Sequence, residues 1–457
     1  MKILLVNPPA RQPRQTTLMV PPLGLAYLAA VLRAAGYPVE VKDAFAEGLS
    51  WEAFADYLAA RRPEILGLTG ISPTIDTAFK AVRLARPYAQ TIIMGGPHVS
   101  VWGQEVFKQC PELDLGVVGE GEDTVVELAA ALARGDSPAG LAGVIGPDFQ
   151  GPRRPLRKDL NGLPFPARDL LPLNRYSYPL AKGKRVTTLF TSRGCPYQCI
   201  FCDKSVFGSR WRGRSPDNIL AEMDEIVRGH HINSLIIYDD LFTFDRHRLQ
   251  QVCEGILRRG YKIDWKCESR VNLVDLETLK LMKRAGCSLV AYGVETGNQP
   301  GLDYLKKNIT LDQIRRAFAL THKAGLESLA YFILGIPVET YADELKTIRL
   351  ACELNPTYAQ FATLSPYYGT QLYQEARAKG WYQELDVKNP ADQDLRRAVV
   401  ISPNWPEANL KKILRRAHLA FYLRPSYVLK RVAAVKSPAH FLNAARGFLA
   451  LGRWLVK

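Results

Sequence analysis

Three cysteines lie within eight residues of one another, in the segment TSRGCPYQCIFC that begins at Thr191 and includes Cys195, Cys199 and Cys202. Their spacing is C-x3-C-x2-C. Thiolates are ligands of soft metals and of iron–sulfur clusters. A cubane cluster has one more iron than this segment has cysteines, so one iron would stay open to a small chelating molecule. The spacing therefore predicts a 4Fe–4S cluster held by these three side chains.

A structural zinc site is the alternative interpretation of the same segment. Zinc in such sites usually has four protein ligands, arranged as pairs of Cys or His. No second pair lies nearby, and His230 and His231 are adjacent residues that follow a predicted helix. The iron–sulfur interpretation is favoured. Gly194, directly before the first cysteine, would let the segment turn sharply.

The remaining cysteines are isolated in the sequence. The chain has eight in all, and the five outside the cluster are Cys110, Cys253, Cys267, Cys287 and Cys352. In a reducing compartment, isolated cysteines are typically small buried side chains, whereas a tight group indicates a metal site.

The composition predicts a soluble globular protein of two or three domains. The chain has 457 residues, of which 47% are hydrophobic and 23% are charged, and no segment approaches the ~20 apolar residues of a membrane span. The apolar run Ile3–Val6 is too short for a signal peptide, whose hydrophobic region has ~7–15 residues. We therefore interpret it as a buried strand and expect a cytoplasmic protein.

The cysteines must be positioned by the elements around them. Residues 1–145 alternate predicted strands with predicted helices, a pattern typical of a parallel sheet covered on both faces. The strands are expected at Lys2–Val6, Val39–Asp43, Ile65–Thr69, Thr91–Gly95 and Leu115–Val118, and the helices at Leu23–Ala35, Trp51–Arg61, Ile75–Ala85 and Thr124–Ala133. The fold class is therefore α/β, with an N-terminal doubly wound, Rossmann-like domain whose ligand crevice lies beyond the carboxyl ends of the strands.

A proline-rich linker, residues 146–183, separates this domain from a second βα series at 184–380. Strands are expected at Val186–Ser192, Ser234–Tyr238, Asp264–Ser269, Leu289–Val294, Ser328–Ile333 and Tyr358–Leu364, and helices at Pro216–Arg228, Arg246–Arg259, Leu273–Ala285, Thr310–Ala324 and Glu339–Leu354. Six such units predict a partial (β/α)6, TIM-like barrel with its active site at the carboxyl ends of the strands. Residues 381–457 are expected to form a basic helical C-terminal region.

The cysteine motif and the segments that follow the later strands together resemble the radical S-adenosylmethionine (radical SAM) enzymes. The aromatic Phe201 precedes the third cysteine, as in that superfamily, and the segments after the successive strands are Tyr238–Thr243, Ser269–Val271, Gly293–Gly297, Gly335–Pro337 and Pro366–Thr370. The resemblance implies that the open iron chelates the amino and carboxylate groups of S-adenosylmethionine. It further implies S-adenosylmethionine contacts from Phe201, Asp239, Asp240, Arg270, Gly293, Glu295, Gly335 and Pro337.

The N-terminal domain resembles the cobalamin-binding domain that is fused to many radical SAM enzymes. The resemblance rests on Asn7-Pro-Pro9 after the first strand and on two glycine-rich segments, Gly95–His98 and Val118–Glu122. It implies cobalamin contacts from Asn7, Ser72, Thr74, Gly95, Gly96, Pro97, His98, Gly119, Glu120 and Gly121. The D-x-H-x-x-G segment that supplies an axial histidine in another cobalamin group is absent, so His98 is not expected to ligate cobalt. A domain that binds nothing is the alternative.

Together the two resemblances imply a cobalamin-dependent radical methyltransferase with a small-molecule substrate and an electron donor such as flavodoxin or ferredoxin. A 5′-deoxyadenosyl radical would take hydrogen from an unactivated carbon, and methylcobalamin would supply the methyl group. Two alternatives stay open. One is a radical enzyme that cyclises, rearranges or oxidises its substrate without net methylation, and the other is a cobalamin- or redox-sensing regulator without turnover.

Charge is concentrated at the C-terminus. The chain carries a formal charge of +15, and residues 408–457 contain eleven Lys or Arg and no Asp or Glu, interspersed with aromatic residues. Basic amphipathic helices of this composition often lie on anionic membrane surfaces. A lipid or other membrane-resident substrate, with peripheral contact at the inner membrane face through 408–457, is therefore a hypothesis. No nucleic-acid-binding module is evident, and no nucleic acid partner is expected.

Overall fold

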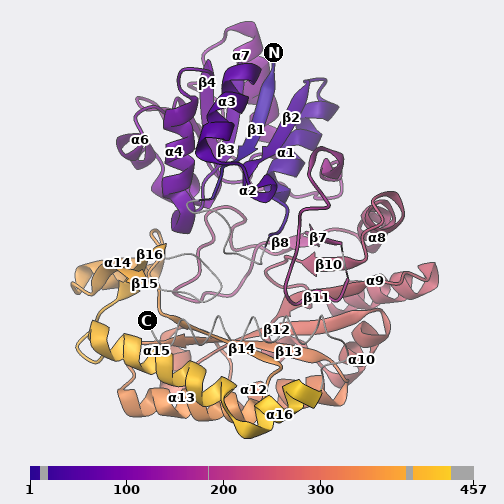
Figure 1. Cartoon of the computed structure of the whole chain (residues 1–457), viewed down its shortest axis with the longest axis vertical. Helices are drawn as coiled ribbons and strands as arrows, with labels where there is room; N and C mark the ends of the chain where they lie inside the picture. The colour runs from indigo at the N-terminus through magenta and orange to yellow at the C-terminus, as the bar shows by residue number, and fades with distance from the viewer. Residues whose placement is uncertain (11–18, 184, 388–394, 434–457) are drawn as a thin grey trace. The chain divides into compact units, whose positions relative to one another are not determined.

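The structure is a computed structural model that describes residues 1–10, 19–183, 185–387 and 395–433 (Figure 1). The chain divides into two compact units. Unit 1 comprises Met1–Pro196, Lys204–Asp240 and Arg258–Trp265. Unit 2 comprises Tyr197–Asp203, Leu241–Leu257 and the chain from Lys266 onward.

The first part of unit 1 is a βα series. Its strands are β1 (Ile3–Asn7), β2 (Val39–Asp43), β3 (Ile65–Thr69), β4 (Thr91–Gly95), β5 (Leu115–Val117) and β6 (Val144–Ile145). Its helices are α1 (Leu23–Ala34), α2 (Ala44–Glu47), α3 (Trp51–Arg61), α4 (Ile75–Ala85), α5 (Pro97–Trp102), α6 (Glu105–Gln109) and α7 (Glu122–Arg134), with a short 3₁₀ turn at Ser72–Thr74. The predicted strands and longer helices are confirmed, while α2, α5, α6 and β6 were not predicted.

The sheet of this series has the strand order β2-β1-β3-β4-β5-β6. The pairs among β1 to β5 are parallel, and β6 joins the edge in the antiparallel direction. The order reverses between β1 and β3, so the chain leaves these two strands in opposite directions. In open sheets of this kind the ligand crevice lies beyond the carboxyl ends of the strands at such a switch point. The doubly wound prediction is confirmed.

Both faces of this sheet are buried, as the alternation of side chains along β1 illustrates. Ile3 and Leu5 belong to one hydrophobic cluster, which they share with residues of α1 and α7. Leu4 and Val6 belong to a second cluster, formed with residues of α3 and α4. Successive side chains of a strand point to opposite faces, so a continuous apolar run indicates a strand that is covered on both.

The proline-rich segment 146–183 belongs to unit 1 and packs against its βα series. Leu163, Ala167, Leu171 and Tyr176 are buried in the cluster that contains Leu5. The hydroxyl of Tyr176 donates a hydrogen bond of 2.8 Å to Asp43, at the end of β2. Extended, proline-rich sequence therefore contributes to the core of unit 1 rather than forming a free tether.

The second βα series follows. Its strands are β7 (Val186–Leu189), β8 (Ser192–Arg193), β9 (Arg212–Gly213), β10 (Ser234–Ile237), β11 (Asp264–Ser269), β12 (Cys287–Glu295), β13 (Glu327–Leu334) and β14 (Tyr358–Thr363). Its helices are α8 (Pro216–Asp224), which continues as a π-turn over Glu225–Gly229, then α9 (Arg246–Arg259), α10 (Leu276–Arg284), α11 (Gln299–Tyr304), α12 (Leu311–Lys323), α13 (Tyr341–Leu354) and α14 (Gln371–Ala378).

Six of these strands follow one another in the sheet order β14-β13-β12-β11-β10-β7, which confirms the predicted partial (β/α)6 arrangement. Local sequence explains where the helices begin. Ser215 caps α8, with proline at the first helical position, and Thr310 and Thr340 form capping boxes at α12 and α13. Each cap satisfies amide groups that the first helical turn leaves without partners.

The C-terminal region departs from the prediction at its start. It opens with the antiparallel hairpin of β15 (Tyr382–Val387) and β16 (Leu395–Val400), and only then continues as α15 (Glu407–Tyr422) and α16 (Pro425–Ala433). The helical prediction is therefore wrong for the hairpin and correct for α15 and α16. The rest of the predicted basic helical region, residues 434–457, lies outside the described residues.

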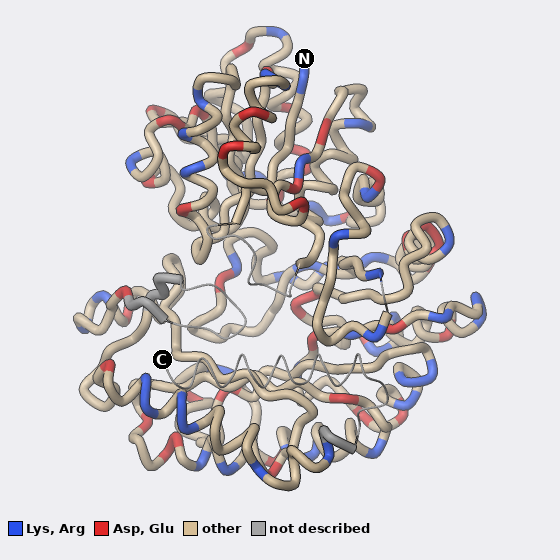
Figure 2. The backbone as a smooth tube through the Cα atoms, viewed as in Figure 1, with Lys and Arg blue, Asp and Glu red and all other residues tan. Residues whose placement is uncertain are grey.

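Helix α15 turns its apolar face into unit 2. Leu410, Ile413, Leu414, Ala417 and Phe421 are buried, in a helix that packs on α13, β13 and β14. The cations of this helix are exposed on its other face, and Figure 2 marks them in blue. The apolar face that could have entered a bilayer is thus part of the protein core. Among the described residues, no helix has both the length and the apolar character needed to cross a membrane.

Candidate functional site

The cysteines lie in the segment between β8 and β9, which pair in the antiparallel direction so that Arg193 faces Arg212. None of the three forms a disulfide bond. Gly194 has φ of 84°, and a Cβ there would lie 2.3 Å from the carbonyl oxygen of Arg210. Only glycine fits at this turn, as the sequence predicted.

Asp239 and Asp240, directly after β10, hold the start of this segment. Asp239 is 1% exposed and accepts hydrogen bonds of 2.6 Å from the amide of Thr191 and the hydroxyl of Ser192, and another from the hydroxyl of Thr191. Asp240 accepts a 3.2 Å hydrogen bond from the amide of Gly194. The carboxylate of Asp239, a predicted S-adenosylmethionine contact, is thus engaged by the backbone and hydroxyls ahead of the first cysteine.

Arg270, after β11, is buried and faces one of the cysteines. Its Nη1 donates to Cys199 Sγ over 3.9 Å, and its guanidinium lies 3.6 Å from the centre of the Tyr197 ring. Its Nη2 donates to the carbonyl oxygen of Lys307. A cation that donates to a thiolate stabilises the negative charge that cluster ligands carry.

Glu295, at the end of β12, has φ of 69°, which is uncommon for a residue other than glycine. Its carboxylate forms a buried ion pair with the ammonium group of Lys307. A Cβ at Gly293 would lie 2.4 Å from Glu295 Oε1 and 2.5 Å from Lys307 Nζ. Gly293 therefore makes room for this pair, and a strained backbone of this kind is typical of functional sites.

A second carboxylate, Glu268 on β11, is paired with Tyr331 on β13. The Tyr331 hydroxyl donates a 3.0 Å hydrogen bond to Glu268 Oε1. Strand β12 lies between β11 and β13 in the sheet, and its residue in register with Tyr331 is Gly293, which has no side chain. Burial raises the pKa of Glu268 to about 7, against the opposing effects of Tyr331 and of Lys266 and Lys307.

The predicted Gly335–Pro337 segment is held by hydrogen bonds to Glu344 and Trp405. Gly335 has φ of 85°, and its amide donates a 2.6 Å hydrogen bond to Glu344. The indole of Trp405, which is fully buried, donates to the carbonyl oxygens of Ile336 at 3.1 Å and Glu339 at 2.8 Å. Phe201 packs against the apolar cluster that contains Ile336.

The residues predicted to contact cobalamin follow the carboxyl ends of β1, β3, β4 and β5. They are Asn7, Ser72, Thr74, Gly95, Gly96, Pro97, His98, Gly119, Glu120 and Gly121. Asn7 donates a 2.8 Å hydrogen bond to Asp43. Gly119 has φ of 80°, and a Cβ there would meet nothing within 4 Å. An open backbone at a strand's carboxyl end is suited to the close approach of a bulky cofactor.

His98 is enclosed by protein groups. Its Nδ1 lies 3.0 Å from Ser72 Oγ and its Nε2 lies 3.3 Å from Gln109 Oε1, while its ring stacks on Trp102. Burial lowers the pKa of His98 to about 4. This geometry agrees with the expectation that His98 is not a cobalt ligand.

Glu120, another predicted cobalamin contact, is held by arginines. Its carboxylate is buried and forms ion pairs with Arg193, at 2.9 Å, and Arg212, at 2.8 Å. The sequence did not indicate the partners of Glu120 and Glu295, which are Arg193, Arg212 and Lys307. The residues of these pairs are separated by 12 to 92 positions, and no local pattern marks such pairs.

The donor sets present fit the expected cofactors. The cysteine segment offers three cysteines outside any disulfide bond, with the buried Arg270 against Cys199, a set typical of an iron–sulfur ligand loop. At the edge of the N-terminal sheet, a Cβ added to Gly119 would point into open space. Among the described residues, no three His, Cys, Asp or Glu side chains are grouped so that they could hold a single metal ion.

Two family models match the chain. The model of the radical SAM superfamily matches residues 189–351, and that of the B12 binding domain matches residues 15–129. The first match covers the cysteine segment and most of the second βα series. The second covers most of the N-terminal sheet.

Full-length similarities agree with these matches. The uncharacterized methyltransferase PH0819 of Pyrococcus horikoshii is 34% identical over 441 residues, which cover 94% of this chain and 95% of that protein. The anaerobic magnesium-protoporphyrin IX monomethyl ester cyclase of Rubrivivax gelatinosus is 31% identical over 368 residues, covering 78% of this chain and 66% of the relative. The hopanoid C-3 methylase of Methylococcus capsulatus is 27% identical over 385 residues, covering 82% and 72%.

The fold is that of a solved methyltransferase. The radical S-adenosylmethionine methyltransferase TsrM from Kitasatospora setae, solved with cobalamin and a 4Fe–4S cluster bound, superimposes with a TM-score of 0.75 and 19% identity, over 93% of this chain and 89% of TsrM. The chain belongs to the radical SAM superfamily, and to its members that carry a B12-binding domain. It is therefore an enzyme, and its cofactors are a 4Fe–4S cluster, S-adenosylmethionine and cobalamin.

Removing any one cluster cysteine is expected to abolish the cluster. Cys195→Ala, Cys199→Ala and Cys202→Ala each leave fewer thiolates than the cluster needs, so iron and acid-labile sulfide per chain should fall to background after anaerobic reconstitution. Cys253→Ala, which removes a buried cysteine outside the segment, should retain both. Full cluster content in any of the first three variants, or stoichiometric zinc in place of iron, would contradict the assignment.

Glu268 makes stability depend on pH. Its folded pKa of about 7 exceeds the ordinary value of 4.5, so between these values the folded chain binds more protons than the unfolded chain, and the free energy of unfolding falls as pH rises. Glu268→Gln removes this loss and should gain up to about 3 kcal/mol on the wild type between pH 5 and pH 8. Urea unfolding at both pH values measures the change. The matched control is Glu353→Gln, in an exposed pair with Arg315, and an equal response of both variants would contradict the prediction.

Proposed function

We propose that this enzyme is a cobalamin-dependent radical SAM methyltransferase that adds a methyl group to an unactivated carbon of a small molecule. The observation that carries the proposal is the presence of both cofactor domains in one chain with full-length similarity to a methyltransferase, at 34% identity over 94% of the chain. A reductant must supply the electron that such chemistry consumes, and we expect a flavodoxin or ferredoxin in that role.

The S-adenosylmethionine site is assigned to residues of the second βα series. We assign ligand contacts to Phe201, Asp240, Arg270, Gly293, Glu295, Gly335 and Pro337, around the cluster of Cys195, Cys199 and Cys202. Support comes from the Arg270 contact with Cys199 and from the positive φ of Glu295 and Gly335. Asp239 is assigned a positioning role, because its carboxylate holds Thr191 and Ser192.

The cobalamin site is assigned to the carboxyl edge of the N-terminal sheet. We assign backbone and hydroxyl contacts to Asn7, Ser72, Thr74, Gly95, Gly96, Pro97, Gly119 and Gly121, and no cobalt ligation to His98. The corresponding domains are 1–145 for cobalamin, 146–183 for the connecting segment, 184–380 for the radical SAM domain and 381–457 for the C-terminal region. The open space at Gly119 supports this assignment.

The chain's own residues bind and orient the cofactors and shield them from solvent. When bound, the cofactors supply a carbon-centred radical and a transferable methyl group. Arg270 is held by Tyr197 and by Lys307, so its guanidinium is oriented before any ligand arrives. The ion pair of Glu295 with Lys307 keeps both charges neutralised in a buried site. Preorganised charges of this kind need no rearrangement at the moment of reaction.

A radical cyclase is the second candidate. It is favoured by the similarity to the Rubrivivax gelatinosus cyclase, at 31% identity. Such an enzyme would use the same cofactors and leave the methyl group off the product.

Methyl transfer can be measured before the substrate is known. Protein reconstituted anaerobically with iron, sulfide and hydroxocobalamin, and then reduced, should form both 5′-deoxyadenosine and S-adenosylhomocysteine from S-adenosylmethionine. With candidate substrates, S-adenosylmethionine carrying a deuterated methyl group should yield a labelled product. The Cys202→Ala variant is the negative control. Deoxyadenosine formation without S-adenosylhomocysteine or any labelled product would contradict methyl transfer and favour the cyclase.

We further propose a lipid-like substrate at an anionic membrane surface. The similarity to a hopanoid methylase supports this, as does the exposed basic face of α15, which comprises Lys411, Lys412, Arg415 and Arg416. Because the apolar face of α15 is buried, the contact would be electrostatic and therefore sensitive to salt.

Flotation with vesicles that contain anionic phospholipid tests the membrane contact. The intact protein should float with such vesicles at low salt and remain behind at high salt. Replacing all four α15 cations by Gln should lower the bound fraction several-fold. Replacing Lys280 and Lys283 on α10 by Gln is the control for a general loss of charge. No binding by the wild type, or equal binding by both variants, would remove the membrane proposal and leave the methyltransferase proposal intact.

A further inference from the structure

Four buried charges meet at the base of the cysteine segment. Arg193 precedes Cys195 by two residues, and Arg212 follows Cys202 by ten. The two arginines are register partners in the β8–β9 pair, so they close the segment at its base. Their side chains converge on Glu120, in the glycine-rich segment after β5. We call Glu120, Glu122, Arg193 and Arg212 the carboxylate clamp.

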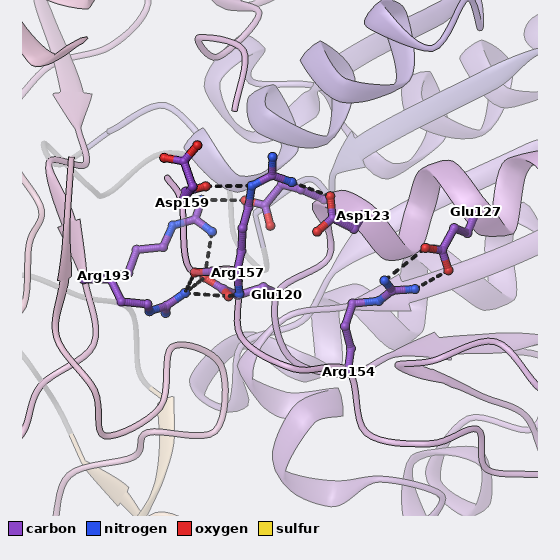
Figure 3. A network of polar contacts seen from close by, with 9 residues as sticks. Glu120, Asp123, Glu127, Arg154, Arg157, Asp159 and Arg193 are labelled. Atoms are coloured by element: carbon purple, nitrogen blue, oxygen red, sulfur yellow. Dashed lines mark hydrogen bonds and ion pairs between the residues drawn. The ribbon is translucent and has the colours of Figure 1, made fainter. Parts of the chain in front are cut away.

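The clamp is held by short contacts, and Figure 3 shows Arg193 directed at Glu120. Arg193 donates to Glu120 at 2.9 Å and, through its other terminal nitrogen, to Glu122 at 2.5 Å. Arg212 donates to both oxygens of Glu120, at 3.0 and 2.8 Å. The four side chains are between 4% and 9% exposed. Each arginine is thus fixed by more than one directed hydrogen bond.

The connecting segment joins the same network. The amide of Arg157 donates to Glu120 at 2.9 Å, and Arg212 donates to the carbonyl oxygen of Arg157 at 2.6 Å. The guanidinium of Arg157 reaches Asp123, on the first turn of α7, at 2.5 Å (Figure 3). Three pieces of chain that are far apart in sequence are therefore tied at Glu120.

Burial makes the network resistant to partial opening. Burial alone would raise the pKa of Glu120, but Arg212 and Arg193 outweigh it and hold the pKa below its usual value. A buried ion left without its partner is strongly unfavourable, so the ion pairs tend to be kept or lost together. The arginine fork also fixes direction, since its donors match the geometry of a carboxylate.

We propose that the carboxylate clamp is a positioning device that fixes the distance between the 4Fe–4S cluster and cobalamin. Glu120 lies between Gly119 and Gly121, which we assign to cobalamin, and Arg193 lies two residues from a cluster ligand, so the proposal rests on that cofactor assignment. A chain of two residues spans at most about 7 Å, which leaves little slack between the clamp and either cofactor. Productive geometry at a reaction centre tolerates displacements of only about 0.5 Å.

The predicted effect is a wider spread of cofactor separations when the clamp is weakened. In the reduced protein, cob(II)alamin and the reduced cluster are both paramagnetic, and pulsed electron paramagnetic resonance reports the distribution of distances between them. Arg193→Lys keeps the charge and removes the fork that joins Glu120 to Glu122. It should broaden the distribution about twofold with iron and cobalt contents unchanged. Glu120→Gln, which removes the central charge, should broaden it at least as much.

The matched control is Glu127→Gln. Glu127 is on α7, as is Glu122 of the clamp, and it pairs with Arg154 of the connecting segment, but its side chain is 49% exposed. The distribution of cluster-to-cobalamin distances in Glu127→Gln should equal that of the wild type. If Glu120→Gln does not fold, as judged by circular dichroism, Arg193→Lys decides the question alone.

The outcomes separate the clamp from the function. Wild-type width in Arg193→Lys, with both cofactors bound, overturns the clamp and leaves the methyltransferase proposal standing. A wild-type protein that binds no cobalamin overturns the cofactor assignment and the clamp together. Because the measurement needs no substrate, a failure of methyl transfer alone leaves the clamp result unaffected.

Discussion

The cysteine segment depends on carboxylates for its position. The strands at its two ends, β8 and β9, have two residues each, and backbone pairing of that length cannot fix a long loop by itself. Asp239 engages Thr191 and Ser192 with three hydrogen bonds on one side, and Glu120 engages both register partners on the other. Each is a buried carboxylate whose charge is compensated by several donors, which is the arrangement in which an internal charge becomes specific rather than merely costly.

The same rule governs the inner residues of unit 2. Arg270, Glu295 and Lys307 are buried, and each has at least one charged or backbone partner. Their partners hold them in one orientation, so a charged ligand would meet an arrangement that already exists. Glu268 differs, because burial dominates over its partners and raises its pKa to about 7. A carboxyl group that is half protonated near neutral pH can donate or accept a proton, and perturbed groups of this kind are concentrated at functional sites.

Features that are local in sequence could be predicted. The bounds of β2, β3, β4 and β11 agree with the expected ranges. Strands β3 and β4 are largely apolar runs, as expected of parallel strands buried on both faces, whereas β2 and β11 alternate apolar and polar residues. The spacing of the cysteines predicts the cluster, and Gly194 predicts the sharp turn before Cys195, where its φ is positive. The strands β15 and β16 do not continue the βα alternation, so the alternation does not predict them. The partners of Glu120 and Asp239 lie 37 to 92 positions away, and no periodicity connects residues at that distance.

The segment Val118–Glu122 shows how one motif can divide its work between backbone and side chains. The resemblance to cobalamin-binding domains implies that Gly119, Glu120 and Gly121 contact the same cofactor. In the structure, the backbone at Gly119 borders open space, whereas the side chains of Glu120 and Glu122 turn inward to two arginines. The glycines leave room for a ligand and the glutamates remove the freedom that glycine would otherwise give the segment. A glycine backbone next to two anchored side chains is a physically consistent way to bind a large cofactor closely and still hold it in one place.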